Sequence, residues 1–290
     1  MKWLIYGSKG WIGRKVCRYL NINHQIIIEG TSRVDNEEAV NQEIITHKPD
    51  RILSFIGRTH GDDITTIDYL EEKGKLFENV RDNLYGPIVL ANLSKIHKIH
   101  FTYLGTGCIF NYDSEHPIDS NIGYTEDSKP NFFGSSYSIV KGFTDRIMHF
   151  YSDTALNIRI RMPISSDLSP RNFITKILKY DKICSIPNSM TVLDELIPIM
   201  LDMAYQKKVG TINLTNPGAI THNQILQKYK EIVDNSFTWK NFTLEEQSQV
   251  LRSERSNNLL DTSKLESLYK GVSNIHDAVE STLYKMKYYF

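Results

Sequence analysis

The sequence has few cysteines, and this scarcity argues against two classes of protein. Its three cysteines are spread along the chain, at Cys17, Cys108 and Cys184. They form no disulfide framework, and they show no paired spacing of the zinc type. The histidines share no metal-ligand spacing either. We therefore expect reduced thiols, a cytoplasmic location and no bound metal.

The chain also lacks net charge and long apolar runs. Its 34 basic side chains balance 34 acidic ones, whereas nucleic-acid-binding and membrane-surface proteins normally carry a basic excess. No apolar run approaches the roughly 18 residues that span a bilayer. The N-terminus reaches Gly7 too soon to hold the apolar core of a signal peptide. We expect no nucleic-acid partner and no membrane partner.

What the sequence does contain is enough apolar material for a large core. Its 290 residues are 40% hydrophobic and 23% charged, which is a globular composition. At roughly 150 residues per domain, this length indicates two domains, or one large α/β unit with an additional lobe.

Apolar runs alternate with helical patterns along the first half of the chain. Strands are predicted over residues 3–6, 25–29, 51–56, 99–104 and 157–162. Helices are predicted over residues 11–20, 37–46, 77–96 (kinked near Pro87) and from about 135 to beyond 148. Residues 111–136 are rich in turn-forming residues and are predicted to be a loop. This alternation predicts crossover units and a mostly parallel sheet that is buried on both faces.

A glycine-rich turn joins the first strand to the first helix. It runs Gly7-Ser8-Lys9-Gly10-Trp11-Ile12-Gly13. The first glycine suits a tight turn, the second lets the backbone approach a pyrophosphate, and the third lets the helix pack on the strand. Three glycines alone are weak evidence, but here they stand in the required strand–turn–helix context. The motif predicts a dinucleotide site, and the alternative is a structural turn without a ligand.

The end of the second strand normally selects the nucleotide. Glu29 could hold a ribose hydroxyl, which favours NADH. Arg33, in Thr31-Ser32-Arg33, could pair with a 2′-phosphate instead. We expect NADPH, with NADH as the alternative and an ordinary surface role as the alternative for Arg33.

Tyr137 and Lys141 lie one helical turn apart, so both side chains project from one face of the predicted helix. An ammonium beside a phenol lowers the phenol pKa, which makes Tyr137 a candidate proton donor. The spacing occurs a second time, at Tyr69 and Lys73. Because Tyr69 lies in a polar loop, we interpret it as a surface tyrosine. Thr106, at the end of the fourth strand, could hydrogen-bond a substrate carbonyl.

These motifs, in this order, resemble the extended short-chain dehydrogenase/reductase family. The closer resemblance is to dTDP-4-dehydrorhamnose reductases and to the plant nucleotide-rhamnose synthases, which are UDP-4-keto-6-deoxyglucose 3,5-epimerase/4-reductases. The strings that carry it cover nearly the whole chain: residues 10–13, 106–110, 161–168, 170–176, 186–191, 237–243 and 255–258. Residues 60–75 match less clearly.

The resemblance implies a role for each matching residue. The implied cofactor-binding residues are Gly7, Ser8, Gly10, Trp11, Ile12, Gly13, Arg33, Phe55, Ile56, Gly57, Asn83, Met162 and Pro163, together with Tyr137 and Lys141. The implied catalytic residues are the reductase triad Thr106, Tyr137 and Lys141 and the epimerisation pair Cys108 and Lys176. The implied substrate-binding residues are Arg171, Asn172, Trp239 and Arg255. By residue type alone, Cys108 would be a small buried residue and Lys176 a solvated lysine.

The resemblance also implies the fold and the activity. We expect an α/β fold of the doubly wound Rossmann type with a smaller, interleaved C-terminal substrate lobe. The NADP-binding domain would span residues 1–162 with a return segment at about 184–216, and residues 163–290 would mainly form the sugar-nucleotide lobe. The expected activity is the conversion of UDP-4-keto-6-deoxyglucose to UDP-L-rhamnose with NADPH, in a homodimer.

Three alternatives to this activity stay open. The first is a reductase that acts only on an already epimerised sugar, which would leave Cys108 and Lys176 as bystanders. The second is a related enzyme for another nucleotide sugar, such as a dTDP or GDP sugar. The third is a non-catalytic NADP-binding regulatory subunit, against which the intact Thr106, Tyr137 and Lys141 argue.

Overall fold

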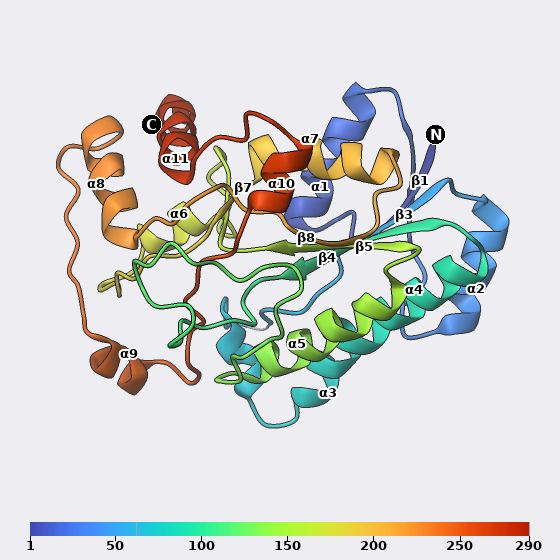
Figure 1. Ribbon diagram of the computed structural model, residues 1–290, viewed down its shortest axis with the longest axis horizontal. Coiled ribbons are helices and arrows are strands. Elements are labelled where there is room, and N and C mark those ends of the chain that lie inside the picture. The colour runs from blue at the N-terminus through green and yellow to red at the C-terminus, as the bar shows by residue number, and fades with distance from the viewer. Residues whose placement is uncertain (62, 290) are drawn as a thin grey trace.

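A six-stranded parallel sheet forms the centre of the protein (Figure 1). The computed structural model describes residues 1–61 and 63–289. The strands lie in the order β2-β1-β3-β4-β5-β8. Their bounds are β1 (Lys2–Tyr6), β2 (Ile26–Glu29), β3 (Arg51–Ser54), β4 (His100–Thr106), β5 (Ala155–Ile160) and β8 (Gly210–Asn213). Strands β2 and β3, which follow β1 in the sequence, pair with opposite edges of β1. The strand order therefore reverses between β1 and β3, and open α/β sheets bind ligands at such a point.

Helices cover both faces of this sheet (Figure 1). One face packs against α1 (Trp11–Ile22), α7 (Leu193–Tyr205) and α10 (Ser263–Leu268). The other packs against α2 (Glu37–His47), α4 (Gly86–Ile96) and α5 (Ser136–Met148). Neighbouring residues of β1 alternate between the two cores, Trp3 and Ile5 in one and Leu4 and Tyr6 in the other. The prediction of a Rossmann-type parallel sheet buried on both faces is confirmed.

The predicted helix over residues 77–96 is interrupted close to Pro87, as predicted. It consists of α3 (Leu76–Val80), a π-helical turn η2 (Arg81–Tyr85) and α4. Pro87, in the first turn of α4, has no N–H to donate to the carbonyl of Asn83, four residues earlier. The irregularity is the wider π turn, whose Asn83 carbonyl accepts a hydrogen bond from the Thr144 hydroxyl at 2.6 Å. Such turns are frequent at functional sites.

The fifth predicted strand begins and ends earlier than predicted, as β5 at residues 155–160. Two residues later the backbone of Met162 has a φ of +36°, which strand geometry does not allow. The chain leaves the main sheet at this point and enters β6 (Pro163–Ile164), which pairs with β7 (Thr191–Val192) in a separate two-stranded sheet.

A second hydrophobic cluster lies around these two short strands. It contains residues of α6 (Phe173–Ile177), α8 (His222–Ile232) and α11 (Ile275–Met286). Between α6 and α8 the chain returns to the main sheet as α7 and β8, so this lobe is assembled from separate stretches of chain. The remaining elements are η1 (Ile67–Glu71), η3 (His149–Tyr151), α9 (Leu244–Val250) and η4 (Lys287–Tyr289). Within the described ranges, no helix has both the length and the apolar character that crossing a membrane requires.

Candidate active site

The glycine turn after β1 is a cradle that side chains would fill. The backbone of Gly7 has a φ of +79°, and a Cβ there would lie 2.9 Å from the carbonyl carbon of Phe55. A Cβ on Gly13 would lie 2.2 Å from the Gly7 carbonyl oxygen, so only glycine fits there. Gly10 caps α1 without a side-chain hydrogen bond, and the first turn of α1 holds no acidic residue. Free N–H groups at a helix N-terminus suit a phosphate, so the cradle fits a dinucleotide.

A buried carboxylate orders the turn after β2, and sequence reasoning missed it. Glu43 of α2 accepts hydrogen bonds from the Thr31 N–H and hydroxyl, both at 2.8 Å, and from the Tyr6 phenol at 2.7 Å. Although burial alone raises the pKa of Glu43, these hydrogen bonds hold it below its usual value. The turn that is expected to select the nucleotide is therefore held in one conformation from beneath.

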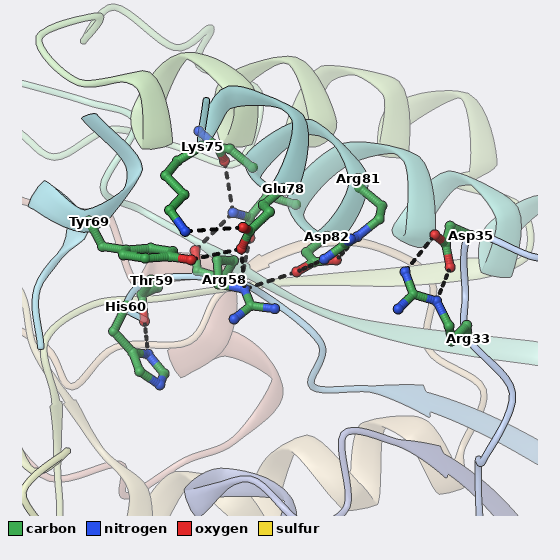
Figure 2. A network of polar contacts seen from close by, with 12 residues as sticks. Arg33, Asp35, Arg58, Thr59, His60, Tyr69, Lys75, Glu78, Arg81 and Asp82 are labelled. Atoms are coloured by element: carbon green, nitrogen blue, oxygen red, sulfur yellow. Dashed lines mark hydrogen bonds and ion pairs between the residues drawn. The ribbon is translucent and has the colours of Figure 1, made fainter. Parts of the chain in front are cut away.

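Arg33, on this turn, is exposed and already paired. Its guanidinium makes two hydrogen bonds to Asp35, at 3.0 and 2.8 Å (Figure 2). Arg81, close enough to act electrostatically on Arg33, is paired with Asp82 at 2.7 Å. Arg33 is therefore balanced by Asp35, whereas Arg81 shares Asp82 with Arg58, which lies 3.0 Å from that carboxylate.

Asn83 fixes the loop that follows β3. Its side chain is fully buried, accepts a hydrogen bond from the Arg58 N–H at 3.0 Å and donates one to the Arg58 carbonyl at 2.8 Å. A Cβ on Gly57 would lie 3.2 Å from the Asn83 amide oxygen and 3.9 Å from the Lys141 Nζ. The loop of Phe55 to Gly57 is therefore clamped from the π turn and runs past the lysine of α5.

Thr106, Tyr137 and Lys141 are all buried where β4 ends and α5 begins. Helix α5 begins here because the Ser135 hydroxyl caps it, accepting a hydrogen bond from the Ser138 N–H at 3.1 Å. The Thr106 hydroxyl lies close enough to the Tyr137 phenol to favour its ionised form and lower its pKa. The structure thus brings together the three residues that the sequence separates by up to 35 positions.

The prediction that the pKa of Tyr137 is lowered is wrong. Burial and the neighbouring Cys108 raise the pKa of Tyr137, and together they outweigh the opposing effect of Thr106. Lys141 donates its hydrogen bond to Tyr103 instead, at 2.5 Å. Burial lowers the pKa of Lys141 to about 8, against the opposing effect of Asp145.

Cys108 borders the triad and is partly exposed. Its N–H donates to the Thr106 hydroxyl at 3.0 Å, and its carbonyl accepts a hydrogen bond from Ser138 at 2.7 Å. It packs in one apolar cluster with Tyr137 and Tyr69. The thiol therefore lies at the same corner as the triad rather than deep in a core.

Lys176 approaches the site from the second lobe, on α6. Burial and the neighbouring Arg171 lower its pKa. Burial, Arg171 and Lys176 also lower the pKa of His60, in the loop after β3, to about 4. The second lobe thus presents two cations to the loop that carries the expected cofactor contacts, which suits an anionic substrate.

Arg255 is held by Asp68, an interaction that sequence reasoning did not find. The two side chains are 2.6 Å apart, and the guanidinium also donates to the Ser253 carbonyl at 2.8 Å. Arg255 and Asp68 both act electrostatically on Tyr180, which follows α6. Arg255 therefore lies where η1 meets the second lobe.

Asn172 and Trp239 are the other two expected substrate-binding residues. Asn172 is fully buried, and its amide donates to the carbonyls of Ser165 and Asp167, both at 2.7 Å. It orders the loop into α6, and its contact with the substrate stays a prediction. Trp239 donates to the Asn223 amide at 2.8 Å and lines a surface groove of about 620 Å³ beside α8.

Tyr69 is buried, with 3% of its surface exposed, so its interpretation as a surface tyrosine is wrong. Its hydroxyl donates to Glu78 at 2.9 Å, and the Lys75 ammonium lies 4.5 Å from the ring centre (Figure 2). A Cβ on Gly61 would lie 2.3 Å from the ring. The ring therefore forms a wall between the loop after β3 and the Tyr137 corner, and no local sequence signal marks this burial.

A parallel sheet with a glycine cradle after β1 and a Tyr–Lys pair on α5 defines the class of dinucleotide-binding short-chain dehydrogenases/reductases. The chain belongs to the NAD dependent epimerase/dehydratase family, whose sequence profile matches residues 3–179. The predicted resemblance to the extended branch of this class is thereby confirmed.

Known relatives refine the comparison. A crystal structure of a UDP-rhamnose synthase from Acanthamoeba polyphaga mimivirus is 55% identical, covers 99% of each chain and has a TM-score of 0.96. A bifunctional dTDP-4-dehydrorhamnose 3,5-epimerase/dTDP-4-dehydrorhamnose reductase from Arabidopsis thaliana is 41% identical over 95% of this chain and 90% of its own. A dTDP-4-dehydrorhamnose reductase from Clostridium acetobutylicum shares the fold, with a TM-score of 0.81 at 18% identity and 98% of each chain covered.

Proposed function

We propose that the protein is a bifunctional 3,5-epimerase/4-reductase that converts UDP-4-keto-6-deoxyglucose to UDP-L-rhamnose. The observation that carries this proposal is the corner where Thr106, Tyr137 and Cys108 meet. A reductase alone needs the Thr–Tyr–Lys triad, and an epimerase needs an additional group that exchanges protons with carbon. Cys108 stands in direct contact with the triad, as a shared site for both reactions requires. The two relatives named as a UDP-rhamnose synthase and as a bifunctional epimerase/reductase support the same assignment.

Epimerisation starts from the acidity of the sugar. The 4-keto group acidifies the protons on C3 and C5, and removal of either leaves an enolate oxygen at C4. Thr106 and Tyr137 would hold that oxygen by hydrogen bonds. Inversion needs a proton donor on the other face of the ring, so Cys108 and Lys176 are assigned as the acid/base pair. The lowered pKa of Lys176 supports this role, because it brings proton exchange closer to neutral pH.

Reduction uses the same oxygen contacts. A nicotinamide cofactor supplies a hydride for C4 when it is bound. Tyr137 delivers the proton to the C4 oxygen, and Lys141, buried beside Gly57, is assigned to the ribose of the nicotinamide. The glycine cradle of Gly7, Gly10 and Gly13 would hold the pyrophosphate.

The proposed cofactor is NADPH. Arg33 and Arg81 stand beside the turn after β2 and offer positive charge for a 2′-phosphate. Glu29, at the end of β2, is exposed and lies 3.8 Å from the exposed Lys9 ammonium, so its carboxylate stays open to a ribose hydroxyl and NADH is the alternative.

The test is NMR of the purified protein with UDP-4-keto-6-deoxyglucose in deuterated water, with and without NADPH. We expect deuterium at C3 and C5 without NADPH, and UDP-rhamnose once NADPH is added. Cys108→Ala should lose exchange but still reduce a supplied UDP-4-keto-rhamnose, and Tyr137→Phe should lose reduction. Cys184→Ala, at another partly buried thiol, is the matched control and should change neither activity.

Three outcomes would support the alternatives instead. Reduction of the supplied keto-rhamnose without any deuterium exchange would make the protein a reductase alone. Tight NADPH binding without turnover of either sugar would favour a regulatory subunit. A dTDP or GDP sugar that turns over faster than the UDP sugar would correct the substrate.

A further inference from the structure

Arg161 is a buried cation whose hydrogen bonds all go to neutral groups. Its side chain is among the largest that are fully buried, and only 1% of the residue is exposed. It donates to the Gly107 carbonyl at 3.2 Å, to the Ser256 hydroxyl and carbonyl at 2.9 and 3.0 Å, and to the Asn188 amide oxygen at 2.6 Å. Its Nε has no hydrogen-bond partner in the described part of the chain. No carboxylate of that part forms an ion pair with it.

Comparison with Arg159, two residues earlier, shows that a buried arginine without a carboxylate partner is unusual. Arg159 is equally buried, and its guanidinium makes two hydrogen bonds to the Asp145 carboxylate, at 2.9 and 2.8 Å. Burying a charge without an opposite charge is strongly unfavourable. Arg159 follows the usual solution and Arg161 does not, so Arg161 calls for a compensating anion that the resting protein does not hold permanently.

The group that can supply this anion is Cys108. Gly107 separates the two side chains: its carbonyl is held by Arg161, and a Cβ on it would lie 3.0 Å from the Arg161 Cγ. Cys108 and Arg161 interact electrostatically. A thiolate at this position would be compensated by a guanidinium that water does not screen.

Other titratable groups near this pair carry no negative charge near neutral pH. Tyr112 and His222 face Arg161, and Tyr137 and Lys141 face Cys108. Burial raises the pKa of Tyr137 and that of Tyr112, the latter to about 12, and burial with Arg161 lowers the pKa of His222 to about 4. Both phenols and the imidazole are therefore neutral, and Lys141 is a second cation.

We propose that Arg161 is the fixed countercharge of the Cys108 thiolate. This inference rests on the proposed function, in which Cys108 exchanges a proton with C3 or C5. When the thiolate removes a proton, an S–H bond forms, a C–H bond breaks, and the electron pair of that bond moves to the C4 oxygen. When the thiol donates, the same changes run in reverse. In both directions the step either begins or ends with a thiolate. Arg161 keeps its proton throughout and is a positioning residue that stabilises this thiolate.

The test is alkylation of the protein without substrate by iodoacetamide over a range of pH, with each cysteine followed by mass spectrometry. The alkylation rate tracks the thiolate fraction. In the wild type, Cys108 should reach its half-maximal rate at a lower pH than Cys17 and Cys184, whose pKa values burial raises. Arg161→Met should slow alkylation of Cys108 about tenfold near neutral pH and move its half-maximal rate to higher pH. Arg161→Lys, which keeps the charge, should retain most of the wild-type profile.

Ser256→Ala is the matched control, because it removes one neutral hydrogen-bond partner of Arg161 and leaves the charge in place. Its pH profile should equal that of the wild type, whereas a purely structural role of Arg161 would affect both variants alike. An unchanged half-maximal pH in a folded Arg161→Met variant overturns the proposal. If that variant does not fold, the wild type decides: a Cys108 no more reactive at low pH than Cys17 and Cys184 overturns it as well. Alkylation needs no substrate, so this result is independent of whether deuterium exchange is found.

Discussion

The Lys141 ammonium donates a hydrogen bond to the phenol of Tyr103 at 2.5 Å and lies 4.8 Å from the centre of that ring. Tyr103 stands on β4, three residues before Thr106, and is itself fully buried. The lysine assigned to the cofactor is therefore already oriented by the strand that carries Thr106. An ammonium has three donors, so this bond leaves two for a bound ribose.

Removing this phenol should weaken the protein and the site together. Tyr103→Phe takes one hydrogen bond from a buried ammonium, so we expect a loss of about 2 kcal/mol in the free energy of unfolding, measured in urea. Because the ammonium loses a stabilising partner, the reductase activity should also decline at a lower pH than in the wild type. Tyr269→Phe is the control, since Tyr269 donates to Asp202 at 2.6 Å outside the site. It should lose comparable stability without moving the pH profile, and equal profiles in the two variants would contradict the prediction.

Activity and stability should respond to pH in opposite directions near the pKa of Lys141. Its folded pKa is lowered to about 8, from 10.5. As the pH rises through about 8 the ammonium is lost, and the reductase rate should fall. Between that pH and about 10.5 the unfolded chain holds a proton that the folded chain has released, so the free energy of unfolding should rise, by up to about 3 kcal/mol.

Lys141→Met isolates this effect. The methionine cannot titrate, so the difference in unfolding free energy between wild type and variant, measured by urea unfolding without cofactor, should shift in favour of the wild type from about pH 8 upward. A difference that stays constant over this range would show that Lys141 is not the group responsible.

Substitutions at two glycines of the cradle should distinguish an effect on folding from an effect on cofactor binding. In Gly13→Ala the new Cβ meets the Gly7 carbonyl oxygen at 2.2 Å, and α1 must move away from β1, so we expect a loss of 3 kcal/mol or more, roughly, in the free energy of unfolding. In Gly10→Ala the closest atom is 3.3 Å away and the φ is an ordinary −71°. That variant should fold nearly normally but bind NADPH about tenfold more weakly, because the methyl group enters the space of the pyrophosphate. Thermal unfolding and NADPH titration of both variants check this, and normal NADPH affinity in Gly10→Ala would mean that the pyrophosphate does not lie there.

Local features made much of this protein predictable from its sequence. The turn from Gly7 to Gly13 is specified by backbone conformation and close packing within a few residues, and the strands by runs of apolar residues. Thr106, Tyr137 and Lys141 could be found because spacing on one helix and position after a strand suffice to mark them. The resemblance then placed Cys108 and Lys176.

Long-range neighbours made the rest unpredictable. Tyr69 is buried because Gly61 and Glu78 close over it, and nothing in its own polar segment indicates that. Asn172 has the residue type of a sugar ligand, and only the structure shows that its amide also bonds to the chain that precedes it. Arg161 differs from Arg159 only in which residues from distant segments surround it, so the sequence alone does not distinguish the paired arginine from the unpaired one.

The choice between NADPH and NADH should depend on whether Arg33 binds the 2′-phosphate or stays paired with Asp35. Its guanidinium is 67% exposed and bonded to Asp35 at 2.8 Å, so a 2′-phosphate has to compete with that carboxylate. Arg33→Ala should raise the KM for NADPH about tenfold and leave that for NADH unchanged. Asp35→Asn should do the reverse and lower the KM for NADPH, because it removes the competing charge.

The ratio of kcat/KM for the two cofactors measures this directly in wild type and variants. Arg18→Ala, at an exposed arginine of α1, is the control and should leave the ratio unchanged. An equal loss with both cofactors in Arg33→Ala would show that Arg33 supports the shape of the turn rather than the phosphate. That result would leave Arg81 as the cation for the 2′-phosphate, because it is the other arginine beside the turn and its partner Asp82 also binds Arg58, at 3.0 Å. Asp82 is thus shared between two arginines, which leaves Arg81 the less fully neutralised of the pair beside the turn.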